Sequence, residues 1–311
     1  MNRRLLFVVV LLTLGTGWGS TQALGKIAAS SGHGIFGLIF WQGVIGVAVL
    51  GAVNLVRGNL ARSNLARSNL ARSKRFWPTP AGLRFAGIIA IIGTVLPTYT
   101  FYSAVTHLPA GIMSILISTI PLLAFPMAMA LGMDRFSPQR LFGLVCGLLG
   151  VGLIVLPGAA LPDPAMAIWV PVALLGPLFY ALEGNIVARW GTFGLDPVET
   201  MFWASLIAAG ITLPLALLGG QMFMLLPIGR PEAALMISSG LHALLYAGYV
   251  WLNGRTGAVF AAQTSYFVTG SGVFWAMGLL GERFSPFVWT ALAIMLAGVA
   301  MVRPRDKPQE G

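Results

Sequence analysis

The chain has 311 residues, of which 57% are hydrophobic and only 9% are charged, and its mean hydropathy is +0.84. In soluble domains about a quarter of the residues are charged, so this composition excludes a soluble globular protein and indicates a protein that crosses a membrane several times. The net charge of +10 does not indicate a nucleic-acid partner, because the basic residues lie between apolar runs and form no basic face. The single cysteine, Cys146, excludes a disulfide framework.

Ten segments are long and apolar enough to cross a bilayer as helices, which takes about 20 residues each. They are expected near residues 5–25, 35–56, 82–105, 110–132, 138–157, 166–188, 197–218, 232–252, 256–279 and 285–302. We expect helices because backbone groups find no water in hydrocarbon, and the sequence lacks the alternation of a membrane β-barrel. The first segment, after Arg3 and Arg4, is predicted to be an uncleaved span, and a signal peptide ending near Ala23 is the alternative.

The distribution of basic residues orients these spans. With the N-terminus inside, sixteen of the nineteen Lys and Arg residues lie on the cytoplasmic side, and only Lys26, Arg230 and Arg283 lie outside. Because cytoplasmic loops are enriched in Lys and Arg, we expect both termini in the cytoplasm. We expect an integral protein of the plasma membrane, which in bacteria is the inner membrane.

A basic low-complexity loop is predicted over residues 57–80. Within it, residues 59–73 repeat Asn-Leu-Ala-Arg-Ser three times. One interpretation is a segment that contacts anionic lipid headgroups. The other is a tolerated surface loop without a specific role.

An internal duplication organises the rest of the chain. Residues 134–138 read Asp-Arg-Phe-Ser-Pro and residues 282–286 read Glu-Arg-Phe-Ser-Pro, 148 positions later. Each copy lies between two apolar runs and therefore predicts the turn of a helical hairpin. Five spans per half is an odd number, so the second half is expected to enter the membrane upside down. We predict a first five-helix repeat over 1–158, a second over 159–303 and a cytoplasmic tail over 304–311.

The most informative polar residue is Glu183, in the sixth predicted span. A carboxylate inside a membrane is costly, so it is expected to face a cavity and to mark a functional site. In such a place it can take and release a proton near neutral pH. The alternative is a carboxylate near the cytoplasmic end of the span that reaches the interface.

Other polar and aromatic residues predict the lining of a substrate and proton pathway. His242, Tyr246 and Tyr249 are spaced i, i+4, i+7 and share one helix face. The duplication places Tyr99 and Tyr102 at equivalent positions of the first half. The remaining candidates are Trp18 and Gln22 in the first span and Gln263 in the ninth. Each of these could instead bridge neighbouring helices.

Several chemistries are missing from the sequence. No His, Cys, Asp and Glu residues have metal-ligand spacing, and no Walker A motif is present. We therefore expect no metal site, no cofactor and no enzymatic activity. The expected partners are a small-molecule substrate, the lipid bilayer and protons, with a homodimer left open.

Three short motifs, in this order, resemble those of the EamA-type transporters of the drug/metabolite transporter superfamily. They are Trp18-Gly19-Ser20 in the first span, Pro121 followed thirteen residues later by Asp134, and Gly281-Glu282-Arg283-Phe284-Ser285 before the last span. The resemblance covers essentially the whole chain. It implies ten spans in two repeats, both termini inside, and a central cavity between the halves.

The resemblance also implies the transport of small metabolites, often amino acids or related compounds, and of drugs. We expect a secondary transporter that works by alternating access and is either proton-coupled or facilitative. The resemblance favours export over import. The alternative is a non-transporting membrane protein that serves interaction or assembly, which would have no central polar cavity.

Overall fold

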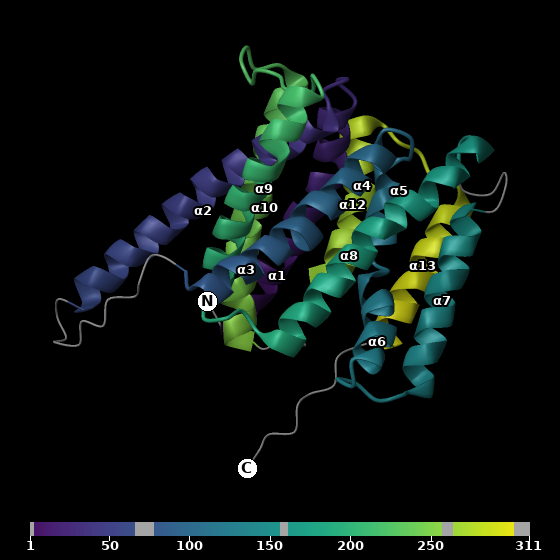
Figure 1. Cartoon of the computed structure of the whole chain (residues 1–311). Helices are drawn as coiled ribbons and strands as arrows, with labels where there is room; N and C mark the ends of the chain where they lie inside the picture. Colours follow the sequence, from purple (N-terminus) through teal and green to yellow (C-terminus); the bar gives the residue numbers. More distant parts are fainter. Residues whose placement is uncertain (1–2, 66–77, 156–160, 257–263, 302–311) are drawn as a thin grey trace.

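The computed structural model describes residues 3–65, 78–155, 161–256 and 264–301, and every regular element in these ranges is helical (Figure 1). The elements of the first half are α1 (Arg3–Ala29), α2 (Ile35–Leu65), α3 (Pro80–Ile89), a π-helical segment (Ala90–Val95), α4 (Leu96–Val105), α5 (Ala110–Ile117), α6 (Ile120–Ala130) and α7 (Pro138–Val155). Those of the second half are a 3₁₀ turn (Pro164–Ile168), α8 (Trp169–Trp190), α9 (Pro197–Leu218), α10 (Arg230–Thr256), α12 (Thr264–Leu280) and α13 (Pro286–Met301).

Seven helical segments of the described residues are long and apolar enough to cross a membrane. They extend from α1 to α9, with the pieces between Pro80 and Val105 and between Ala110 and Ala130 each counted as one span. α13 is apolar but shorter, and α10 and α12 are outside the seven, so the count of ten remains a prediction. Large apolar side chains such as Leu148 and Leu149 are about 60% exposed on the outside of α7, as lipid contact requires.

Proline residues divide two of the spans into shorter pieces. Pro97 has no amide hydrogen, so the hydrogen bond to the carbonyl four residues earlier cannot form. The helix adapts just before it with a π-helical turn, in which the Leu96 amide donates to the Ile91 carbonyl. Pro121, the second residue of α6, follows a different break, in which the Ser118 and Thr119 amides donate to carbonyls three residues earlier.

Helix α2 is longer than its apolar pattern indicates. Its span was expected to end at residue 56 and a loop to begin at 57, but the helix continues to Leu65. The added residues include Leu, Ala and Arg, which favour helix even outside a membrane. Residues 66–77 of the predicted basic loop lie outside the described ranges.

The helices pack in pairs that join the two halves of the chain. α2 lies along α9, and α7 lies along α13 at the edge of the molecule (Figure 1). α1 packs between α10 and α12, whereas α8 packs against α4 and α6. The first turn of α1 and the last turn of α13 both lie in the lower part of Figure 1.

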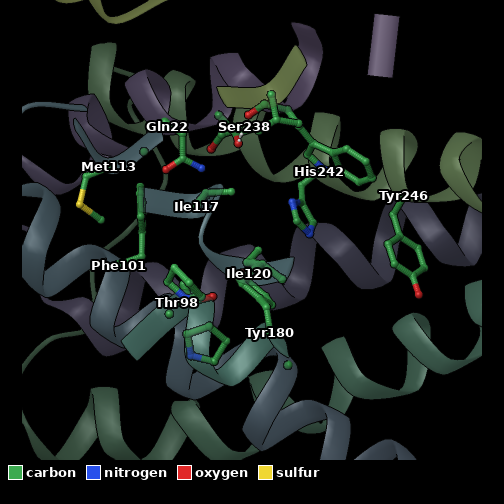
Figure 2. Close-up of a pocket in the computed structure, with 18 of the residues that line it drawn as sticks. Gln22, Thr98, Phe101, Met113, Ile117, Ile120, Tyr180, Ser238, His242 and Tyr246 are labelled. Carbon is green, nitrogen blue, oxygen red and sulfur yellow. Dashed lines mark hydrogen bonds between the residues drawn. The ribbon is translucent and has the colours of Figure 1, made fainter. Parts of the chain in front are cut away.

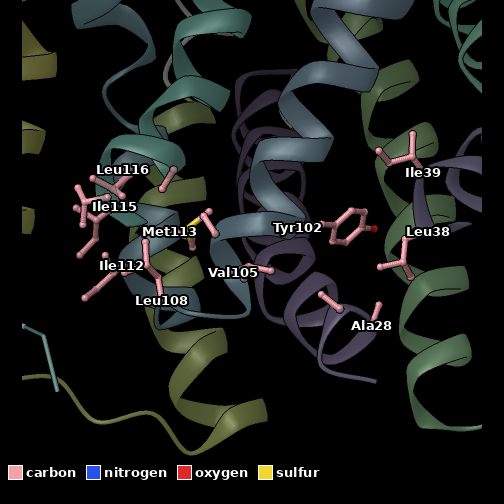
Figure 3. Packing of buried hydrophobic residues seen from close by; sticks show 14 of the residues in the cluster. Ala28, Leu38, Ile39, Tyr102, Val105, Leu108, Ile112, Met113, Ile115 and Leu116 are labelled. Carbon is pink, nitrogen blue, oxygen red and sulfur yellow. The ribbon is translucent and has the colours of Figure 1, made fainter. Parts of the chain in front are cut away.

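The main apolar core surrounds the short helices of the first half. Ile112, Ile115 and Leu116 of α5 are fully buried, and Leu38 and Ile39 of α2 belong to the same cluster (Figure 3). α5 has no exposed face, because α1, α8, α12 and α13 pack around it. The helices that surround the candidate site are therefore held by packing on both sides.

Candidate functional site

A cavity of about 520 Å³ lies between the two halves of the chain (Figure 2). Its lining comes from α1, α2, α4, α5 and α6 of the first half and from α8, α9, α10 and α12 of the second, with Gly93 of the π-helical segment. A side cavity of about 40 Å³ adjoins it and shares Tyr180, Ser239, His242 and Tyr246. The volume is within the range of about 300–1,000 Å³ that small-molecule sites occupy.

Three prolines shape this cavity and change its chemistry. Pro97, Pro121 and Pro177 all line it, and so do the residues four positions before them, Gly93, Ile117 and Ala173. The carbonyls of those three residues lose their usual helical donor, because proline has no N–H. Irregular helices at membrane depth are tolerated where they line a water-filled cavity, because water can pair with the freed backbone groups. The cavity therefore accounts for the presence of these prolines within the spans.

Glu183 of α8 is the only carboxylate among the described lining residues. It lies so close to Gly93 that a Cβ atom added to that glycine would be 2.5 Å from the Glu183 Cδ atom. Among the described residues, the carboxylate has no ion pair and no hydrogen bond to the protein. Arg189, six residues along the same helix, is not paired with it.

Tyrosines surround the carboxylate on two sides. Tyr180 lies one turn before Glu183 in α8, and Tyr246 approaches from α10, both near enough to interact with its charge. Tyr102 of α4 is 2% exposed and donates its hydroxyl hydrogen to the Gln42 Oε1 atom, at 3.2 Å. Tyr102 belongs to the first half of the chain, whereas Tyr180 and Tyr246 belong to the second.

An aromatic wall of Trp18, His242 and Tyr249 forms another part of the cavity lining. The Trp18 ring lies 5.6 Å from the ring of Tyr249 and 6.1 Å from that of His242. Trp18 belongs to α1 and the other two to α10, so this wall joins the halves where their helices cross. Within the described residues, no hydrogen bond or ion pair joins His242 to Glu183.

Several buried polar atoms of the lining have no hydrogen-bond partner in the described structure. They are Trp18 Nε1, Gln22 Oε1, Ser239 Oγ and Thr264 Oγ1. Gln22 is only 8% exposed, and Figure 2 shows its side chain above Thr98 and Tyr180. Buried polar groups are normally paired, so these atoms are available to a ligand or to water.

The structure brings together seven of the nine predicted pathway residues. Glu183, His242, Tyr246, Tyr249, Tyr102, Gln22 and Trp18 all line the cavity. Gln263 lies outside the described residues.

The predicted placement of Tyr99 needs correction. It is 40% exposed, and its ring packs against Phe36 at 5.4 Å instead of lining the cavity. Successive helix residues are rotated by about 100° around the axis, so the four lining residues of α4, which are Pro97, Thr98, Phe101 and Tyr102, span an arc of roughly 140°. Tyr99 lies about 60° outside this arc.

Two kinds of lining residue were missed from the sequence. Tyr180 is three residues before Glu183 and therefore shares its helix face, a spacing that could have identified it. Ser238, Ser239 and the three prolines gave no such signal, because only tertiary packing decides which face of a helix meets a cavity.

A cluster of polar contacts, the Glu282 cluster, joins the halves beside the cavity. It consists of Lys26, Leu108, Ala110, Gly111 and Glu282. The Glu282 carboxylate accepts from the Ala110 and Gly111 amides, at 2.8 and 3.1 Å, and pairs with Lys26 Nζ at 3.1 Å. Lys26 also donates to the Leu108 carbonyl, at 2.8 Å. An acidic group favours the N-terminus of a helix, here that of α5.

Comparison with known proteins agrees with this architecture. The model of the EamA-like transporter family matches residues 5–156. This part of the chain belongs to the EamA-like transporter family. Membership indicates a membrane transporter of small solutes and makes a non-enzymatic role plausible.

Solved structures extend the likeness over the whole fold. Twenty-one solved chains match this chain. In one of them, a crystal structure, the matched region spans 94% of this chain and 94% of the solved chain, with a TM-score of 0.60. Its sequence is 19% identical, so the likeness concerns the fold alone. No curated protein matches the chain significantly.

Proposed function

We propose that this protein is a secondary transporter that moves small metabolites, such as amino acids and related compounds or drugs, by alternating access. The observation that carries the proposal is the cavity of about 520 Å³ between the halves, in which Glu183 is the one carboxylate among the described lining residues. A scaffold without transport activity has no use for such a site. Export from the cell across the plasma membrane is the proposed direction, following the family resemblance.

The proposed architecture is ten spans in two inverted repeats, with both termini in the cytoplasm. The packing supports two related repeats, because the most extensive helix contacts between the halves recur when each helix is replaced by its equivalent in the other half. α1 contacts α10 and α12, and its equivalent α8 contacts α4 and α6, the equivalents of those two. α2 contacts its own equivalent α9, as α7 contacts α13. Transporters built this way bind substrate at the interface between repeats.

In this mechanism Glu183 carries the coupling proton. The described lining contains no Lys or Arg that could neutralise the carboxylate. Because an unpaired charge inside a membrane is costly, the carboxylate binds a proton when the cavity holds no substrate. Tyr180 and Tyr246 lie beside it and offer hydroxyl groups for transfer between the carboxylate and water in the cavity. Opening of the cavity to alternate sides then links proton and substrate movement.

Counterflow into proteoliposomes tests the proposal. Vesicles are loaded with unlabelled amino acids, nucleosides and cationic drugs, and each labelled compound is supplied outside. We expect at least one compound to accumulate transiently in vesicles with protein and none in empty vesicles. Failure of all compounds would reject the transporter and favour the interaction protein.

Glu183→Gln tests the proton step in the same vesicles. The variant keeps the shape of the side chain but cannot ionise, so we expect counterflow to lose its dependence on pH and uptake driven by a pH gradient to fall at least about tenfold. Asp163→Asn is the control, because that residue lies outside the cavity and its side chain only caps a 3₁₀ turn. Gradient-driven uptake that survives Glu183→Gln would remove the proton role.

A further inference from the structure

We infer that the cavity binds organic amine cations with an apolar or aromatic body, and that Glu183 is their counter-ion. The inference rests on the proposed function and specifies its substrate class. It follows from three independent features of the lining: its charge, its hydrogen-bonding groups and its aromatic wall.

The charge of the lining favours cations over anions. Glu183 is the only acidic residue among the described lining residues, and none of them is Lys or Arg. An anionic substrate would meet the Glu183 carboxylate and no Lys or Arg in the described lining, whereas an ammonium group would neutralise the unpaired carboxylate.

The lining also offers hydrogen-bond acceptors. The carbonyls of Gly93, Ile117 and Ala173 each lack the helical donor that proline removes, and all three residues line the cavity. The Gln22 Oε1 atom is buried without a partner. An ammonium group has three donors and no acceptor, so it matches these groups better than a carboxylate does.

The aromatic wall suits the rest of an amine. The faces of tryptophan and tyrosine rings attract cations, and the same rings bury apolar groups. Trp18 and Tyr249 belong to this wall, and the apolar side chains of Phe101 and Met113 also line the cavity. A volume of about 520 Å³ exceeds what a lone metal ion or Na⁺ needs, which favours an organic cation.

Four compounds with one phenyl ring separate the charge types. Purified full-length protein in detergent is titrated with 2-phenylethylamine, 2-phenylethanol, 3-phenylpropionate and phenylalanine, and its thermal shift and tryptophan fluorescence are recorded. NaCl alone is a fifth arm. We expect the amine to bind at least about tenfold more tightly than the neutral alcohol and the anion, because only it pairs with a buried carboxylate.

A variant then assigns the preference to one residue. Glu183→Gln should reduce the affinity for the amine by about tenfold or more and leave the affinity for the alcohol unchanged. Asp163→Asn, which keeps all charges of the cavity, should retain the full preference. The ligand series with unmodified protein decides the question even if the Glu183→Gln protein does not fold.

Three results would overturn the inference. They are no amine binding at millimolar concentration, equal binding of the amine and the alcohol, and tightest binding of phenylalanine, of the anion or of Na⁺. None of these results rejects a transporter, since counterflow of a neutral or zwitterionic compound would still support the proposed function. Conversely, tight amine binding without any counterflow would preserve the site and reject transport.

Discussion

At the scale of single residues, the close contact between Gly93 and Glu183 is the feature that positions the carboxylate. Glycine at 93 leaves room for the carboxylate, and the π-helical turn before Pro97 brings that backbone toward α8. A side chain at 93 would meet the flexible end of Glu183 and not its backbone. The carboxylate can therefore be displaced without disrupting the helix pair.

Gly93→Ala should impair the site more than the fold. We expect amine affinity and pH-gradient-driven uptake to fall by roughly tenfold, because the carboxylate has to move away from its present position. The free energy of unfolding should stay within about 1 kcal/mol of the unmodified protein. Gly87→Ala in α3 is the matched control, since no atom lies within 4 Å of the added Cβ. Equal behaviour of the two variants would contradict this role of Gly93.

Several polar residues chosen from the sequence line the cavity, but the sequence did not indicate which residues surround them there. Glu183 and His242 were found because ionisable groups are rare in apolar spans, where their cost demands an explanation. The placement of Tyr99 was wrong because the alignment of the two repeats gives equivalent positions along a helix. It does not show which face of the helix lines the cavity. Tyr180 was not predicted because an aromatic residue in an apolar span has a low free-energy cost in the membrane and does not by itself indicate a functional site.

At the scale of elements, the contact between α7 and α13 depends on small residues. A Cβ atom at Gly298 would lie 2.6 Å from the Gly143 carbonyl oxygen and 3.2 Å from the Gly147 amide nitrogen. Both are backbone atoms and cannot move aside individually. Close approach of backbones replaces the missing hydrophobic driving force between membrane helices.

Gly298→Ala should therefore destabilise the protein by about 1–3 kcal/mol, the usual cost of overpacking. Thermal unfolding in detergent measures the difference. Gly152→Ala in α7 adds the same methyl group where no atom lies within 4 Å, so its melting temperature should stay the same or rise slightly. A stable Gly298→Ala variant would show that α7 and α13 separate without cost.

The elements themselves were largely predictable, because apolar length and proline positions are local properties of the sequence. Their internal breaks were not. The division of the third predicted span at Ala90–Val95 depends on how the helix accommodates Pro97 against α8 and α9. α2 also continues past its apolar run to Leu65, because the residues there have a high helix propensity. A prediction based on hydropathy does not detect this property.

At the scale of the whole molecule, the Glu282 cluster connects the two halves at one end of the cavity. Lys26 follows the lining residue Gly25 in α1, and the amides of α5 that bind Glu282 begin the helix that carries Met113. The Glu282 side chain is 13% exposed and that of Lys26 is 23% exposed. If the protein works by alternating access, opening this end requires these contacts to separate.

Glu282→Gln should shift the molecule toward the state that is open at this end. The amide side chain keeps one acceptor for the α5 amides but loses the attraction to Lys26 and to the helix dipole, which together favour closure by about 1–3 kcal/mol. We expect a cysteine at position 113, in a Cys146→Ala background, to react about fivefold or more faster with a membrane-impermeant thiol reagent. Asp163→Asn in the same background controls for the loss of a negative charge elsewhere, and no acceleration with Glu282→Gln would mean that the cluster only stabilises α5.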